Sequence, residues 1–258
     1  AVRGKYTIDS TSGAYLTDES VFILSGDFNG KLQGQIDLNF DDANFNRLGQ
    51  TIGFKELQGF GSGYFRFSGN LLDPDLSSYL LLDSLGYSDM RGYGIEENIE
   101  IKNILTNRKG NYQLDVMAGS FGPVDLTDAI IDLNIDHNRI HFDSLTFYNF
   151  DNLLDIKGKV EFDSNTIDLV FEKFNTQYEN VGIYNPDSLF LSYTDNELHF
   201  KKVYFETSTG GTIDAGGFIN FADSASNFSL DISKVNLQFL NQFEFLPYQL
   251  SGIVDLNG

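Results

Sequence analysis

The chain has 258 residues, a formal net charge of −20 and neither Cys nor Trp. Its 41% hydrophobic content is too high for a disordered acidic tail, and the lack of Cys excludes disulfide scaffolds, thiolate metal sites and cysteine nucleophiles. The negative charge argues against nucleic acid as a partner, and without a run of about 18 apolar residues the sequence predicts no membrane-spanning helix.

Apolar and polar residues alternate along much of the chain, first at Ile36, Leu38 and Phe40, which Asp37 and Asn39 separate. The same period of two recurs over 132–136, 154–162, 167–171 and 228–232. Alternation of this kind, rich in Val, Ile, Leu and Phe, predicts half-buried β-strands. At the usual length of a strand with its turn, we expect about 16–20 strands.

Turn and helix signals lie between these strands. Clusters of Asp, Asn and Ser predict turns at 41–44, 163–165 and 223–227. Helical spacing is scarce, and we expect only short helices over 44–54 and 235–243. Few strands have two apolar sides, which argues against a parallel α/β sheet and predicts an all-β fold.

An internal repeat links the first part of the chain to its end. Gly63 to Gly69 matches Gly252 to Gly258, with the same spacing of glycines and apolar residues at the same positions between them. A strand entered through glycine is therefore a recurring unit, which is typical of an elongated repeat architecture. We expect one continuous β-repeat segment over 1–258, with sub-repeats 1–69 and 70–258, cut from a longer protein.

A sheet with this pattern must cover its apolar face. It can fill its own core, as a β-sandwich does, or remain an open groove that holds acyl chains, and alternation alone does not separate the two. The opposite face is predicted to be solvated, since it carries the acidic residues Asp37, Asp132, Asp155, Glu161, Asp168 and Asp231. The side chains expected to line the apolar face are Ile36, Leu38, Phe40, Phe65, Phe67, Leu133, Ile135, Leu154, Ile156, Val160, Phe162, Ile167, Leu169, Phe171, Ile219, Phe221, Phe228, Leu230, Ile232, Val254 and Leu256.

The run LSGIVDLNG at 250–258, after a short Leu-bearing segment, resembles the repeat unit of the AsmA-like proteins, especially the TamB (translocation and assembly module) group. Residues 61–69 followed by Pro74 are similar to the same unit with its downstream proline. The stretches 138–147 and 154–162 resemble the paired strands of that family. The motifs are degenerate, and the resemblance as a whole extends over most of the chain.

The resemblance implies an elongated, curled, taco-like repeat sheet whose concave face is an apolar groove. It further implies a location in the periplasm, with a tether to the inner membrane in a segment missing from this chain. Phospholipid would be the cargo, and an outer-membrane barrel of the BamA or TamA type would be a partner. The family offers no catalytic residues to carry over, so we expect no enzyme activity and no cofactor.

Other candidate sites are weaker. His137 and His141 are four residues apart but lie in no helical pattern, so we expect surface histidines rather than a metal site. The alternation around His199 predicts that its side chain lies on the outer, solvated side of its strand. The acidic pairs at Asp73–Asp75 and Asp41–Asp42 lack the spacing of a calcium loop.

Two other functions remain open from the sequence. A structural or adhesive β-repeat of a bacterial surface protein predicts a dry, self-packed core without lipid. A carbohydrate-active β-enzyme predicts a polar cleft with carboxylates and Trp, and Trp is absent.

Overall fold

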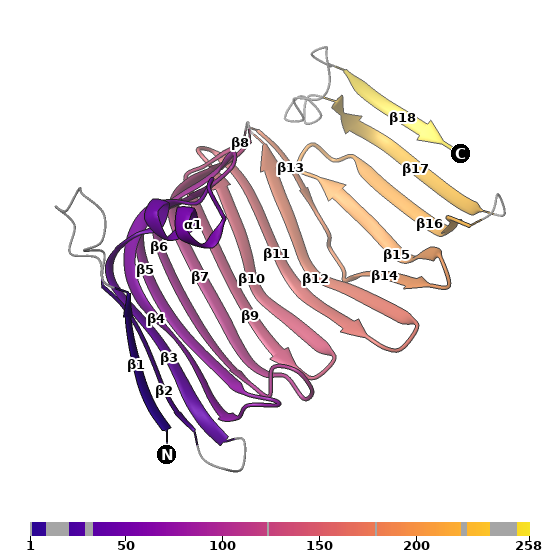
Figure 1. Cartoon of the computed structure of the whole chain (residues 1–258). Helices are drawn as coiled ribbons and strands as arrows, with labels where there is room; N and C mark the ends of the chain where they lie inside the picture. The colour runs from indigo at the N-terminus through magenta and orange to yellow at the C-terminus, as the bar shows by residue number, and fades with distance from the viewer. Residues whose placement is uncertain are drawn as a thin grey trace. The chain divides into compact units, whose positions relative to one another are not determined.

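A computed structural model describes residues 2–8, 21–28, 33–122, 124–178, 180–222, 226–237 and 252–258, and these form a nearly all-β structure with antiparallel pairing. The predicted fold class is confirmed at this level. The chain divides into two compact units, Ala1–His137 (unit 1) and Asn138–Gly258 (unit 2). Within each unit, consecutive long strands run side by side (Figure 1). The sub-repeats 1–69 and 70–258 stay a prediction.

Unit 1 is an antiparallel meander in which β1 pairs with β2 and each later strand pairs with the one before it as far as β7. β7 then pairs with both β8 and β9. The strands are β1 (Val2–Ile8), β2 (Val21–Phe28), β3 (Gln33–Asn44), β4 (Gln58–Asn70), β5 (Asp75–Tyr87), β6 (Met90–Lys102), β7 (Lys109–Phe121), β8 (Val124–Leu126) and β9 (Asp128–Asp136).

Unit 2 repeats the meander, with one interruption where β13 and β14 share β12 as a neighbour and β15 follows both. β10 pairs with β11 as expected from 138–147 and 154–162. The strands are β10 (Arg139–Asn149), β11 (Asn152–Phe162), β12 (Thr166–Tyr178), β13 (Val181–Tyr184), β14 (Leu189–Thr194), β15 (Glu197–Thr207), β16 (Thr212–Asn220), β17 (Asn227–Asn236) and β18 (Ile253–Asn257).

The interruption of unit 2 has a local cause at Asn185 and Pro186. Pro186 has no N–H to donate to a ladder, so the strand cannot continue through it. Asn185 replaces the missing ladder bonds with its side chain, which accepts from Phe174 N at 2.5 Å and donates to Phe171 O at 3.2 Å. β12 therefore stays continuous while its partner is split.

Every predicted alternating segment lies in a strand, but the turn predicted at 41–44 is wrong. These residues continue β3 through a bulge opposite Gly61–Gly63, and Asp42 has a φ of 43°. Ser62 holds the bulge, because its hydroxyl accepts from Asp42 N and donates to Asp41 Oδ1, each at 3.0 Å.

One of the two predicted helices is present. α1 (Phe45–Ile52) begins after Asn44, whose side chain accepts from the N–H groups of Asn46 and Arg47, and ends at Gly53 in the left-handed conformation. Figure 1 shows α1 across one end of the unit 1 strands. The helix predicted over 235–243 is wrong at its start, since Val235 and Asn236 finish β17, and residues 238–243 lie outside the described residues.

Candidate functional site

The cross-strand register of unit 1 brings the predicted lining residues to one side of the sheet, here called the Leu38 face. Leu38 lies opposite Phe65 of β4, and the same row continues through Ser78, Ile99 and Tyr112. Directly opposed residues of antiparallel strands share a face. The predicted residues on this face are Ile36, Leu38, Phe40, Phe65, Phe67, Leu133 and Ile135.

The sequence prediction missed the part of this face that lies on β5, β6 and β7. These strands alternate in the same way, and their registers join the rows of β4 to those of β9. Their alternation of apolar and polar residues is visible in the sequence. The additional apolar residues on the face are Leu76, Leu80, Leu82, Ile95, Ile99, Ile101, Leu114 and Val116.

One end of the Leu38 face is a closed core beneath α1. Phe45 of the helix meets Phe40 of β3 edge to face, with ring centroids 5.7 Å apart. Ala43, Leu82 and Ile95 complete this buried cluster. The helix therefore covers the end of the face at which β3 finishes.

In unit 2 the registers again gather the predicted residues on one side, here called the Leu169 face. One row runs from Val160 through Leu169, Leu191 and Phe200. The described residues of this unit form no α-helix. The predicted residues on the face are Leu154, Ile156, Val160, Phe162, Ile167, Leu169, Phe171, Ile219, Phe228, Leu230, Ile232, Val254 and Leu256.

Phenyl rings form a continuous ladder along the Leu169 face. The ring of Phe171 lies 6.1 Å from Phe142 and 6.1 Å from Phe174, and Phe174 lies 5.4 Å from Phe205. Edge contacts at these distances are favourable for aromatic pairs. The ladder links β10, β12 and β15 through side chains as well as backbone.

Several members of the Leu169 face remain open to solvent. The exposed fraction is 39% for Phe162, 41% for Ile167, 39% for Phe228 and 51% for Leu256. Phe221 lies just beyond the end of β16 and is 64% exposed. These side chains are not covered by the rest of the chain that the structure describes. That the predicted residues line a groove for lipid is still a prediction.

The opposite sides of both units are mainly polar, although they include exposed apolar residues such as Leu81 and Phe190, and they carry the acidic residues expected there. Asp37 pairs with Arg66 at 2.7 Å, Asp155 pairs with Lys173, and Asp168 pairs with Lys201 at 3.6 Å. Asp132 and Asp231 lie on these polar sides by register. A hydrogen bond from Lys159 and the neighbouring Arg139 guanidinium lower the pKa of Glu161. Four of the acidic residues expected on these sides, Asp37, Asp155, Glu161 and Asp168, therefore have a cationic partner.

The Leu38 face contains one buried acid, Glu97, which the sequence analysis did not single out. It is 7% exposed and accepts a hydrogen bond at 2.7 Å from Ser78 Oγ, which is fully buried. Burial raises the pKa of Glu97, and the bond from Ser78 opposes that rise in part. Burial and the charge of Glu97 also raise the pKa of Tyr112. The alternation of Ile95, Ile99 and Ile101 places position 97 on the apolar side, which is the signal that could have found it.

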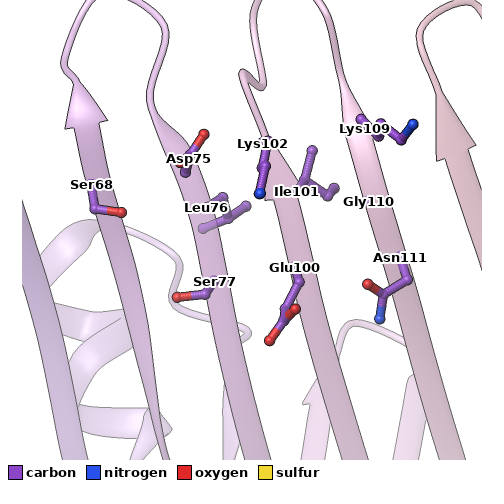
Figure 2. A pocket seen from close by; sticks show the side chains of 10 residues that line it. All are labelled: Ser68, Asp75, Leu76, Ser77, Glu100, Ile101, Lys102, Lys109, Gly110 and Asn111. Atoms are coloured by element: carbon purple, nitrogen blue, oxygen red, sulfur yellow. The ribbon is translucent and has the colours of Figure 1, made fainter.

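A shallow pocket of about 360 Å³ lies near the ends of β4, β5, β6 and β7 (Figure 2). Its polar contributors include Glu100, Lys102 and Lys109, and Lys102 lies directly opposite Lys109 in the register. The side chains in Figure 2 are spread along four strands and do not converge on one point.

His137 and His199 each lie beside an acidic side chain, and Asp73 has hydrogen-bond partners within the chain. His137 Nδ1 lies 2.6 Å from Asp136 Oδ1, and His199 Nε2 lies 3.0 Å from Glu197 Oε2. Asp73 accepts from Leu105 N and from the Thr106 hydroxyl, so it closes the loop between β6 and β7. Within the described residues, no three His, Cys, Asp or Glu side chains are grouped to hold a metal ion.

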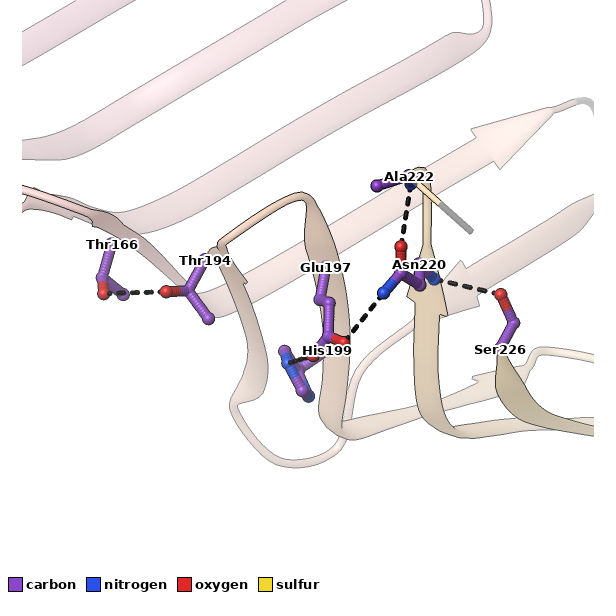
Figure 3. A network of polar contacts seen from close by, with 7 residues as sticks. All are labelled: Thr166, Thr194, Glu197, His199, Asn220, Ala222 and Ser226. Carbon is purple, nitrogen blue, oxygen red and sulfur yellow. Dashed lines mark hydrogen bonds and ion pairs between the residues drawn. The ribbon is translucent and has the colours of Figure 1, made fainter. Parts of the chain in front are cut away.

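Asn220 organises a polar network at the strand ends of unit 2 (Figure 3). Its Nδ2 donates to Glu197 Oε1 at 3.0 Å, its Oδ1 accepts from Ala222 N at 2.8 Å, and its own N–H donates to Ser226 Oγ at 3.0 Å. These bonds join the end of β16 to β15 and to Ser226, which directly precedes β17. Their partners are satisfied within the chain, so the network is structural.

Searches against protein families, curated proteins and solved structures found no match to this chain. Among the described residues, no helix is long and apolar enough to cross a membrane.

Proposed function

We propose that this chain is a segment of a periplasm-spanning bridge that holds lipid acyl chains against the Leu38 and Leu169 faces. The observation that carries the proposal is the half-open Leu169 face, where Phe162, Ile167 and Phe228 are each about two-fifths exposed while charged pairs occupy the other side. Monomeric soluble proteins rarely leave contiguous apolar rows open unless something binds to them.

Acyl chains suit such rows chemically. Each CH₂ group removed from water contributes about 0.8 kcal/mol, so a chain lying across several strands gains affinity from every row it covers. Successive rows are similar in composition, and strands are about 4.8 Å apart. A lipid tail would therefore find nearly equal sites along the sheet and slide between them rather than stay at one.

The wider role follows from the resemblance of residues 250–258 and 61–69 to the TamB repeat. In this proposal the bridge is tethered to the inner membrane outside this chain and moves phospholipid to the outer membrane. It also supports assembly of outer-membrane proteins with a barrel partner of the BamA or TamA type. The proposed bridge needs no catalytic step, since the Leu38 and Leu169 faces present rows of apolar side chains.

The second candidate function is a structural β-repeat with a self-packed core. The buried cluster beneath α1 favours it, because Phe40, Phe45 and Leu82 are already covered by the chain itself. The two candidates make different predictions for the Leu169 face of unit 2. The lipid-bridge proposal requires lipid on this face, whereas a structural or adhesive repeat requires none.

Charged substitutions separate these candidates. Leu169→Arg and Phe162→Asp place a charge on the Leu169 face, whereas Val170→Arg places the same charge as Leu169→Arg on the opposite side of β12. We expect the yield of phospholipid crosslinks to fall at least tenfold in the first two variants and to stay unchanged in Val170→Arg. Circular dichroism verifies that all three variants are folded. Unchanged crosslinking in folded Leu169→Arg would overturn the proposal.

A further inference from the structure

The Leu38 face carries a charge-bearing group in apolar surroundings. Glu97 lies directly opposite Leu80 of β5 and Leu114 of β7, with Ile95 and Ile99 on the same strand. Burying a carboxylate without a counter-charge is costly. The free energy lost by burying the Glu97 carboxylate on this apolar face must therefore be offset by some favourable interaction.

Among the residues that the structure describes, no cation lies beside Glu97. The side chains that share the face with Glu97 on β5, β6 and β7 are aliphatic except for Ser78 and Tyr112, and neither carries a positive charge. The hydrogen bond recorded for the Glu97 carboxyl uses Oε2 alone, with Ser78 as donor. Within the described residues, Oε1 has no donor and is able to accept from a ligand.

The charge selects the kind of head group that fits. A fatty-acid carboxylate or a phosphate would meet a like charge in a medium of low dielectric constant, which raises its energy. A primary ammonium would supply both the missing counter-charge and N–H donors, and charge-assisted hydrogen bonds are the stronger kind. The neighbouring Leu and Ile side chains suit an alkyl chain attached to that ammonium.

We propose that Glu97, positioned by Ser78, is the head-group site for a long-chain amphiphile bearing a primary ammonium, whose alkyl chain lies along the Leu38 face. The inference rests on the proposed function, since it assigns a head-group chemistry to the same acyl-holding face. It places that chemistry on unit 1, between the core beneath α1 and the rows of Ile99 and Ile101.

Three probes with one chain length test it: dodecylamine, dodecanol and dodecanoate, titrated below their micelle concentrations into the full chain at pH 7 by calorimetry. We expect dodecylamine to bind at least tenfold more tightly than dodecanoate. Glu97→Gln should remove most of that difference and leave dodecanol binding unchanged. Glu96→Gln is the matched control, because it removes the same charge from the neighbouring position on the opposite side, where Glu96 accepts from the Tyr79 hydroxyl.

The outcomes separate the two proposals. If none of the probes binds, the acyl-holding function itself fails. If all three bind alike, or if Glu96→Gln and Glu97→Gln weaken dodecylamine equally, the face holds chains but the Glu97 site does not exist. A readout without any variant is carbodiimide coupling of bound dodecylamine to the protein, in which the activated carboxyl forms an amide with the amine and releases the urea. Mass spectrometry should place the dodecyl amide on Glu97 in preference to Glu96; equal amide formation at the two positions would overturn the inference.

Discussion

Unit 1 and unit 2 are built from the same alternating strands but differ in what lies against the apolar side. In unit 1, α1 places Phe45 on Phe40 and closes one end of the Leu38 face. In unit 2, the described residues contain no α-helix, and the phenyl ladder is flanked by side chains as exposed as Phe228. One strand pattern thus supports both a closed core and a half-open face, and the covering element decides which is formed.

The largest expected effect is on the closed end of unit 1. Phe45→Ala removes a buried ring and leaves a cavity, which should lower the free energy of unfolding by about 3–5 kcal/mol. Phe54→Ala is the control, since Phe54 is 56% exposed. Guanidinium titrations of both variants measure the difference. Equal effects would mean that α1 does not secure the core.

The next effect concerns the backbone of unit 2. Gly217 has a φ of 98°, and a Cβ added there would lie 2.0 Å from Asn227 O. Gly217→Ala should therefore cost about 1–3 kcal/mol of stability. At the adjacent Gly216, the nearest atom to an added Cβ is Ser229 Oγ at 3.4 Å, so Gly216→Ala should change the stability by less than about 1 kcal/mol. Thermal unfolding of the two variants tests the contrast, and a reversed order would contradict it.

The smallest expected effect is on the pH dependence of stability, and it arises from Glu97 in unit 1. Burial raises the pKa of Glu97 above its ordinary 4.5, so the folded state favours the protonated form. That stabilisation is complete below the ordinary pKa and is lost as pH rises through the raised one. Wild-type protein should therefore lose stability relative to Glu97→Gln as pH increases above 4.5. Parallel stability curves for the two proteins would show that Glu97 is not desolvated.

The sequence predicted the strands because alternation is a local signal. The segments 34–40, 154–162 and 228–232 lie in β3, β11 and β17. The helix at 44–54 was predictable from its spacing, and its ends are marked by Asn44 and Gly53.

The errors arose where distant residues decide the local structure. Asp41 and Asp42 have turn chemistry, but Ser62 of the next strand holds them in β3. Val235 lies in a helix-like pattern, but its pairing with Val254 and its near-complete burial keep it in a strand. The covering of a face is also a tertiary property, so alternation could not tell the closed end of unit 1 from the half-open face of unit 2.

The most direct test compares two phenylalanines of equal exposure on opposite sides of unit 2. Phe228 lies on the Leu169 face, Phe190 points to the other side of β14, and both are 39% exposed. A benzophenone amino acid placed at each position in turn is photolysed in the presence of phospholipid, and the crosslinked product is identified by mass spectrometry. The account predicts lipid adducts several-fold more abundant at position 228 than at 190; equal labelling at both positions, or none at 228, would contradict it.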